Sequence, residues 1–75
     1  MDAKEKRNFM KASRVRAGLS QEKLAEILGV ARNTIVYYES KPWSISLETF
    51  NKLVNLYGAT FRDDFFANKL YKKDN

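Results

Sequence analysis

The sequence predicts an all-α fold, a compact arrangement of five helices in a single domain. Apolar residues recur at three- and four-residue spacings along most of the chain, and no segment shows the alternation of a β-strand. Gly18, Gly29 and Gly58 each follow such a segment by about one residue, where a helix C-cap is expected, and Pro42 blocks continuation of the third segment. The expected helices span residues 4–17, 20–28, 31–39, 47–57 and 61–70.

The size and charge of the chain limit the functions that it can support. Its 75 residues form one domain, with residues 1–3 and 72–75 expected to be frayed, and leave no room for a separate sensor domain. The net charge is +5, of which residues 1–20 contribute +4. This basic balance suits a polyanionic partner, although it also serves simply to keep a small protein soluble.

Several classes of chemistry are excluded by composition. The chain has no cysteine and no histidine, which excludes disulfides, thiolate or imidazole metal sites and a Ser-His-Asp triad. The adjacent carboxylates of Asp63 and Asp64 indicate helix capping rather than acid–base catalysis. The N-terminus is too charged for a signal peptide, and no apolar run is long enough to span a membrane. We therefore expect a cytoplasmic protein that is not an enzyme and needs no metal or cofactor.

Residues 19–39, LSQEKLAEILGVARNTIVYYE, predict two short helices joined by a tight turn. Ser20 is a favourable N-cap, and Leu24 opens an apolar face with 3.6-residue spacing. Gly29 stands where the first helix needs a left-handed residue. Ile35 and Tyr38 lie on one face of the second helix. Two helices with a glycine-bearing turn between them form a helix-turn-helix.

The segments GLSQEKLAEILGV and RNTIVYYE resemble the phage-repressor and Cro-like helix-turn-helix family, also called the xenobiotic-response-element family. Matches recur at fixed spacing, and SLETFNKLVNLYG is similar to the fourth helix of the family, so the resemblance extends to about residue 58. It implies a lambda-repressor-like domain that binds a double-stranded DNA operator, in a prokaryotic cell or a phage-infected host. The matching positions are Gly18, Leu19, Ser20, Gln21, Leu24, Ala25, Gly29, Val30, Ile35 and Glu39.

The residues on the outward face of the second motif helix can be deduced from those on its inward face. If Ile35 and Tyr38 face the core, residue 32 stacks on 36 and residue 33 on 37 at the surface. In the major groove, arginine grips guanine O6 and N7, asparagine pairs with adenine, and apolar groups contact thymine methyls. The predicted base-reading residues are Arg32, Asn33, Val36 and Tyr37. Tyr37 could instead donate to a phosphate.

Four further residues are expected to contact the DNA backbone: Gln21, Thr34, Ser40 and Lys41. Gln21 lies in a first helical turn, where free N–H groups favour a phosphate, and family members often place a glutamine there. An ordinary polar residue at a helix start is the alternative. Lys41 occupies a position where the family usually has glycine, which predicts a different loop path.

The resemblance also implies a structural ion pair between Arg14 and Glu39, because family members pair these two positions across the edge of the core. We expect a partly buried, bidentate pair; a solvated arginine is the alternative. Ala31 departs from the serine or threonine that often caps the second motif helix, so we expect this helix to start without a side-chain cap.

The last part of the chain leaves two interpretations open. Its apolar residues either all pack inward or form a dimer interface, since helix-turn-helix proteins commonly bind two symmetric half-sites. The candidate interface residues are Phe61, Phe65, Phe66, Leu70 and Tyr71. Thr60 is expected to cap the fifth helix. Trp43 is expected to cover the core, with a phosphate contact or a dimer contact as alternatives.

These observations predict a sequence-specific DNA-binding transcriptional regulator, a Cro-like or compact repressor of phage type that occludes an operator as a homodimer. The alternative is a protein-interaction module, antitoxin-like or anti-repressor, that binds a second regulator protein through the aromatic C-terminal surface. The two differ in whether residues 59–71 remain exposed.

Overall fold

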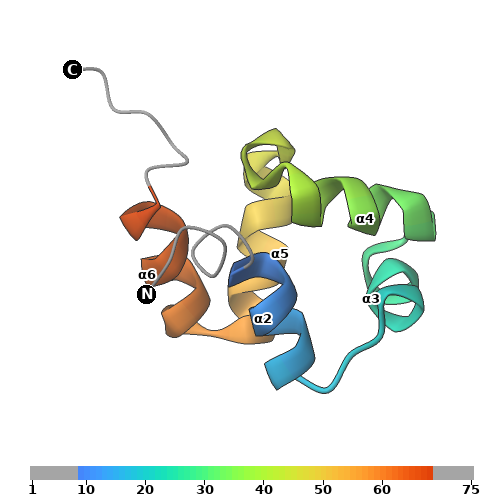
Figure 1. Cartoon of the computed structure of the whole chain (residues 1–75), viewed down its shortest axis with the longest axis horizontal. Helices are drawn as coiled ribbons and strands as arrows, with labels where there is room; N and C mark the ends of the chain where they lie inside the picture. Colours follow the sequence, from blue (N-terminus) through green and yellow to red (C-terminus); the bar gives the residue numbers. More distant parts are fainter. Residues whose placement is uncertain (1–8, 69–75) are drawn as a thin grey trace.

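The computed structural model describes residues 9–68, and this region contains five α-helices and one short 3-10 helix (Figure 1). No strand occurs within it, so the all-α prediction is confirmed. The expected helical residues 4–8 and 69–70, with Leu70 and Tyr71, lie outside the described residues. The elements are α2 (Phe9–Arg16), α3 (Gln21–Leu28), α4 (Arg32–Ser40), η1 (Pro42–Ser44), α5 (Leu47–Tyr57) and α6 (Ala59–Ala67).

Serine caps define where two of the helices begin. The hydroxyl of Ser20 accepts from the Lys23 N–H at 3.0 Å, and that of Ser46 accepts from the Thr49 N–H at 3.1 Å. Each bond satisfies a backbone donor that has no partner inside its helix. In contrast, Ala31 precedes α4 without any side-chain cap, as the sequence indicated.

The turn between α3 and α4 closes through backbone hydrogen bonds. Gly29 adopts a left-handed conformation (φ 72°, ψ 34°), and its N–H donates to the carbonyls of Ala25 and Glu26. The next N–H, of Val30, also donates to the Ala25 carbonyl, at 3.0 Å. Ala25 itself is buried within α3, where its small side chain suits two closely packed helices. These bonds fix the angle between α3 and α4.

The junction between α5 and α6 corrects one expectation. Gly58 has φ 98° and ψ −174°, a conformation that is essentially restricted to glycine, and its N–H donates to the Val54 carbonyl at 2.8 Å. This single residue ends α5 and immediately precedes α6. The prediction that Thr60 caps the fifth helix is therefore wrong, because the helix already begins at Ala59.

The core is built largely from aromatic rings contributed by α2, α5 and α6. Phe61 and Phe65 are fully buried, with exposed fractions of 0%. Phe9 stacks on Phe61 at a centroid distance of 5.9 Å, and Phe50 lies 4.8 Å from Phe65. In Figure 1, α6 lies beside α2 and α5 at the end of the molecule opposite to α3. The buried apolar residues are Phe9, Met10, Leu24, Ala25, Ile35, Ile45, Phe50, Leu53, Phe61 and Phe65.

This packing corrects the candidate dimer interface. Phe61 and Phe65 cannot meet a partner in the folded protomer, because the core encloses their rings completely. The excess of aromatic residues near the C-terminus instead completes the core of a small domain. Phe66 remains 51% exposed, although its ring lies 5.8 Å from that of Phe50.

The connection from α4 to α5 also differs from expectation. Trp43 was expected to cover the core but is 60% exposed, whereas its neighbours Pro42 and Ile45 are buried. The short η1 helix explains the difference, since it directs Pro42 and Ile45 inward and Trp43 outward. The Lys41 ammonium lies 5.8 Å from the centre of the indole ring, within the range of a cation–π contact.

Candidate nucleic-acid interface

One face of α4 is buried and the opposite face is open to solvent. Ile35 has an exposed fraction of 0% and Tyr38 is half-buried against the core. The outward side, named here the reading face, consists of Arg32, Asn33, Val36 and Tyr37. Val36 is 40% exposed and Tyr37 is 48% exposed, although both are large and can bury apolar surface. Arginine and asparagine side chains can hydrogen-bond to base edges, and apolar side chains can contact thymine methyls.

Of the four residues expected to contact the DNA backbone, Thr34 and Ser40 lie in α4, Lys41 follows it, and Gln21 begins α3. Thr34 is half-buried in the first turn of α4. Lys41 is exposed directly after α4, and its N–H donates to the Tyr37 carbonyl at 2.8 Å. Its side chain is therefore the group available to a phosphate.

Ser40 does not lie in the loop where it was expected. The helix α4 includes Ser40 as its last residue, so its N–H belongs to the helical hydrogen-bond pattern. Its hydroxyl donates to the carbonyls of Val36 and Tyr37, at 3.3 and 3.1 Å. Both donors of Ser40 are thus directed into its own helix in the free protein.

Arg14 and Glu39 are brought together at the edge of the core. The Arg14 Nε donates to Glu39 Oε2 at 2.5 Å and Nη2 approaches Oε1 at 3.4 Å, while Nη1 donates to the Leu19 carbonyl at 2.8 Å. Only 9% of the Arg14 side chain and 11% of the Glu39 side chain is exposed. The pair joins α2 to the last turn of α4, so the direction of α4 depends on it.

Gln21 shares this carboxylate. Its Nε2 donates to Glu39 Oε1 at 3.2 Å, which connects the first turn of α3 to the same pair. The amide has a second N–H and an oxygen that this bond does not use. Gln21 is therefore held in place by the core edge while it still has a donor for a phosphate.

The buried pair also acts on a tyrosine of α5. Burial, followed by the negative charge of Glu39, raises the pKa of Tyr57 to about 12, and the positive charge of Arg14 opposes this increase. The phenol therefore stays protonated at neutral pH and can act as a hydrogen-bond donor or acceptor, but not as a base.

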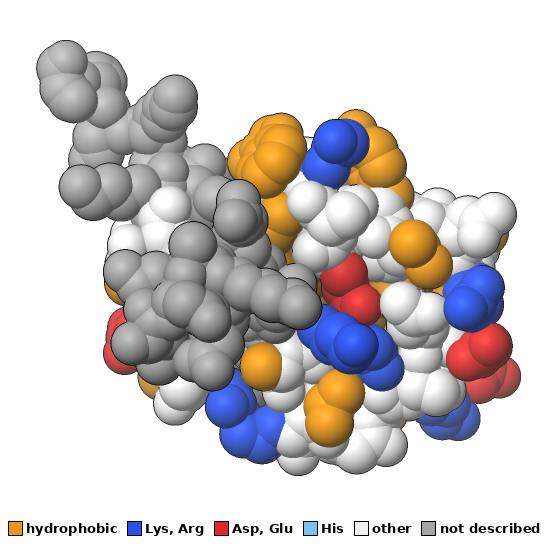
Figure 2. Space-filling model, in the orientation of Figure 1, with side chains coloured by type: hydrophobic (Ala, Val, Ile, Leu, Met, Phe, Trp, Pro, Cys, Tyr) orange, Lys and Arg blue, Asp and Glu red, His pale blue; other side chains and the backbone are white. Residues whose placement is uncertain are grey.

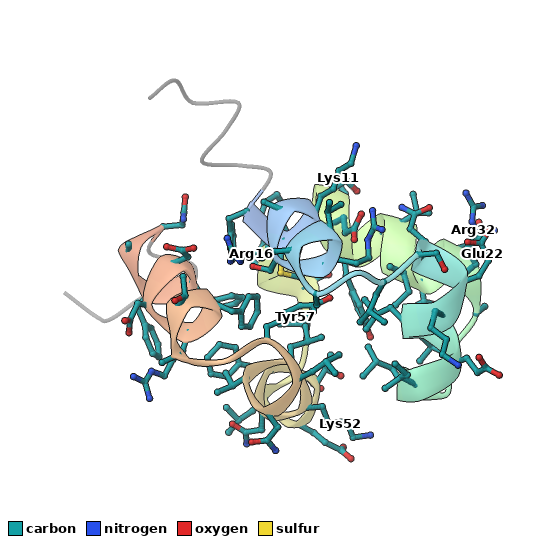
Figure 3. The ribbon with its side chains drawn as sticks, turned by 90° about the horizontal axis from the view of Figure 1, so that it is seen from below. Lys11, Arg16, Glu22, Arg32, Lys52 and Tyr57 are labelled. Atoms are coloured by element: carbon teal, nitrogen blue, oxygen red, sulfur yellow. The ribbon has the colours of Figure 1, made fainter. Side chains whose placement is uncertain are left out.

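An ion pair that the sequence did not predict involves Arg32, the first residue of the reading face. The Arg32 Nε lies 3.1 Å from Glu22 Oε2, and the two side chains are 53% and 70% exposed. Figure 3 shows the two residues side by side at the outer end of α3 and α4. They come from different helices, ten positions apart, so only the angle of the helix-turn-helix brings them together.

Charge is distributed rather than concentrated on the visible surface. On the face shown in Figure 2, basic side chains are separated by neutral and apolar ones, and acidic groups lie beside basic ones. Three basic residues of α2, namely Lys11, Arg14 and Arg16, are described, and Arg14 is neutralised by Glu39. Within residues 9–68 no cluster of three potential acidic metal ligands occurs, and none of the helices there is long and apolar enough to cross a membrane.

The helices α3 and α4, with the Gly29 turn between them, define a helix-turn-helix domain. Comparison with protein families agrees, since the family model described as Helix-turn-helix matches residues 10–63. The chain belongs to this family, which confirms the resemblance seen in the sequence. The chain is also similar to an uncharacterized HTH-type transcriptional regulator of Archaeoglobus fulgidus, with 34% identity over 59 residues that cover 79% of this chain and 84% of the relative. No solved structure matches.

Proposed function

We propose that this protein is a sequence-specific regulator of transcription that inserts α4 into the major groove of double-stranded DNA. The observation that carries the proposal is the outward presentation of Arg32, Asn33, Val36 and Tyr37 on a helix whose other side is anchored by the fully buried Ile35. Membership in a helix-turn-helix family and similarity to a relative named as a transcriptional regulator support it.

In this mechanism the side chains divide into two roles. Arg32 donates to guanine O6 and N7, Asn33 pairs with adenine, and Val36 and Tyr37 contact thymine methyls. Gln21, at the start of α3, and Lys41, after α4, hold the backbone phosphates on either side of the groove. Thr34 supports the same backbone contact from the first turn of α4, and Ser40 contributes only if its hydroxyl turns away from its helix.

We further propose that the protein is a Cro-like, compact repressor that occludes an operator, binding it as a homodimer. Such domains commonly occupy two half-sites related by a two-fold axis, about 34 Å apart. Trp43, in η1, and Leu47, the first residue of α5, support a contact between protomers, because they are large apolar side chains that are 60% and 64% exposed. Occlusion requires no second domain, since a bound protein blocks polymerase by its presence.

The protein-interaction alternative depended on an exposed aromatic C-terminal surface. Because Phe61 and Phe65 are buried, most of the described part of that surface does not exist, and we do not extend the proposal to a second regulator protein.

Selection of bound sequences from a random pool of DNA duplexes tests the proposal. We expect a palindromic consensus whose half-sites are about one helical turn apart. Binding should weaken with salt, with a log–log slope of about −0.9 for each phosphate contact. Occlusion is tested by transcription in vitro from a promoter that contains the selected site. Equal affinity for selected and random duplexes at physiological salt would refute the proposal.

Asn33→Ala and Lys41→Ala form a matched pair for separating the two roles, because both residues are exposed and neither is bonded to the core. Asn33→Ala should remove the preference for one base and weaken binding to the selected site by about 1–3 kcal/mol. Lys41→Ala should weaken all sequences alike and reduce the salt slope by about one contact. The same pattern from both variants would contradict the assignment.

A further inference from the structure

The ion pair between Glu22 and Arg32 places a carboxylate beside the reading face. Arg32 lies at the start of α4 and Glu22 in the first turn of α3. Both side chains project to the same edge of the molecule (Figure 3). A second acidic residue of α3, Glu26, is engaged differently, since it pairs with Lys23 on its own helix at 3.3 Å. Glu22 is thus the acid of α3 that bridges to α4.

The geometry of this pair leaves the end of the guanidinium group available. Glu22 approaches Arg32 at Nε, and within residues 9–68 the two terminal nitrogens of Arg32 make no hydrogen bond. Those two nitrogens form a planar fork that matches O6 and N7 of guanine. The contact with Glu22 at Nε therefore leaves the two terminal nitrogens without a hydrogen-bond partner in the described part of the chain and available to guanine.

From this arrangement we infer that Glu22 is a positioning residue for base recognition, which holds Arg32 for guanine and increases the penalty for any other base. The inference rests on the proposed function of Arg32. Holding the long arginine side chain in one geometry before binding reduces the conformational entropy lost on binding. An exposed pair is weak in water, but it strengthens when DNA displaces the solvent around it.

The carboxylate also acts against incorrect sites. If Arg32 turns away from a base that it cannot bind, Glu22 is left unpaired close to the negatively charged DNA. This repulsion adds to the lost hydrogen bonds, so specificity arises from an unfavourable contact as well as a favourable one. Glu22 consequently lowers affinity for random DNA while it improves discrimination.

The test compares Glu22→Gln with Glu26→Gln, which removes the same charge from the same helix without touching Arg32. The base pair read by Arg32 is first identified as the position of the DNA site at which Arg32→Ala no longer prefers one base pair over the others. Discrimination at this base pair should fall about 3–10-fold in Glu22→Gln, and affinity for random duplexes should rise. Glu26→Gln should change affinity for all sequences equally. In an Arg32→Ala background, Glu22→Gln should no longer change discrimination.

A measurement without DNA keeps the inference separate from the proposed function. The NMR signal of the Arg32 Nε–H group should shift and gain mobility in Glu22→Gln but not in Glu26→Gln. A free Arg32 side chain in the wild-type protein would overturn the inference, as would full discrimination by Glu22→Gln. A different result would be an ordered Arg32 in a wild-type protein that shows no base preference. That result would establish the ion pair but reject the proposed function, and with it the role of Glu22 in recognition.

Discussion

Replacing Glu39 by glutamine tests the arrangement that fixes the direction of α4. The substitution keeps the size of the side chain and one acceptor oxygen, so it removes charge rather than packing. Arg14, whose side chain is only 9% exposed, would then face a neutral amide. Loss of one partner from a buried ion pair costs about 3–5 kcal/mol. Because each side chain retains some solvent contact and one oxygen still accepts a bond, we expect about 2–3 kcal/mol here.

Thermal and urea unfolding measure this change. For a domain of this size each kcal/mol moves the melting temperature by about 4–8 °C, so Glu39→Gln should melt roughly 10–20 °C below wild type. Glu48→Gln is the matched control, because its partner Lys52 lies 3.8 Å away and Glu48 is 81% exposed. That variant should stay within about 0.5 kcal/mol of wild type. A melting temperature for Glu39→Gln within about 2 °C of wild type would refute the reasoning.

A double-mutant cycle separates the pair from its surroundings. Arg14→Met and Glu39→Met should each destabilise the protein, whereas the double variant should recover much of the loss, because an apolar pair leaves no unpaired charge. A coupling energy near zero would show that the two side chains act independently, despite the Nε–Oε2 distance of 2.5 Å.

Three further predictions follow from the fold. The pKa of Tyr57 is about 10 in the unfolded chain and about 12 in the folded protein, so its contribution to stability is complete below pH 10 and is lost as the pH rises toward 12. After allowance for the half-exposed ring, this contribution is about 1–2 kcal/mol. In Tyr57→Phe, the free energy of unfolding in urea should therefore depend less on pH between about 10 and about 12. Gly58→Ala should destabilise by about 1–3 kcal/mol in urea unfolding, because φ 98° with ψ −174° is strained for alanine, whereas Gly29→Asn should cost less, because asparagine tolerates the left-handed region. Trp43→Ala should leave the free energy of unfolding within about 0.5 kcal/mol of wild type but weaken the dimer on operator DNA in analytical ultracentrifugation; a loss of several kcal/mol would show that Trp43 packs in the core.

Much of the fold could be predicted because local signals and packing agree. The spacing of Leu24, Ala25 and Ile35 indicated which sides of α3 and α4 face inward, and all three are buried. Ser20 and Gly29 indicated the ends of α3, and both take the expected cap geometry. These predictions depend on hydrogen bonds within a few residues of the chain, which a sequence displays directly.

Predictions failed where a residue had to be placed relative to distant parts of the chain. An aromatic residue suits a core and an interface equally, so composition could not show that Phe61 is enclosed by Phe9 and Phe50 while Trp43 is exposed. The start of α6 was missed for another reason. Gly58 ends one helix and begins the next, and the sequence displays no separate cap for the second.

Within the candidate site, spacing on one helix was enough to define the reading face, because i,i+4 neighbours share a side. Contacts between helices were not accessible in the same way. The Arg14–Glu39 pair was expected only from family resemblance, and nothing local to Glu22 indicated its contact with Arg32. Gln21 was expected at a phosphate, and no pattern in the sequence predicted its bond to Glu39.

The exposure of Val36 and Tyr37 on a helix held by the fully buried Ile35 has a consequence for how such a protein can change. Neither side chain belongs to the core cluster, so substitutions at these two outward positions should cost little stability while they change the DNA target. A library randomised at Asn33, Val36 and Tyr37 should consist mostly of folded proteins. Selection on such a library would then act on recognition alone, which makes this small domain a suitable starting point for engineered operator specificity.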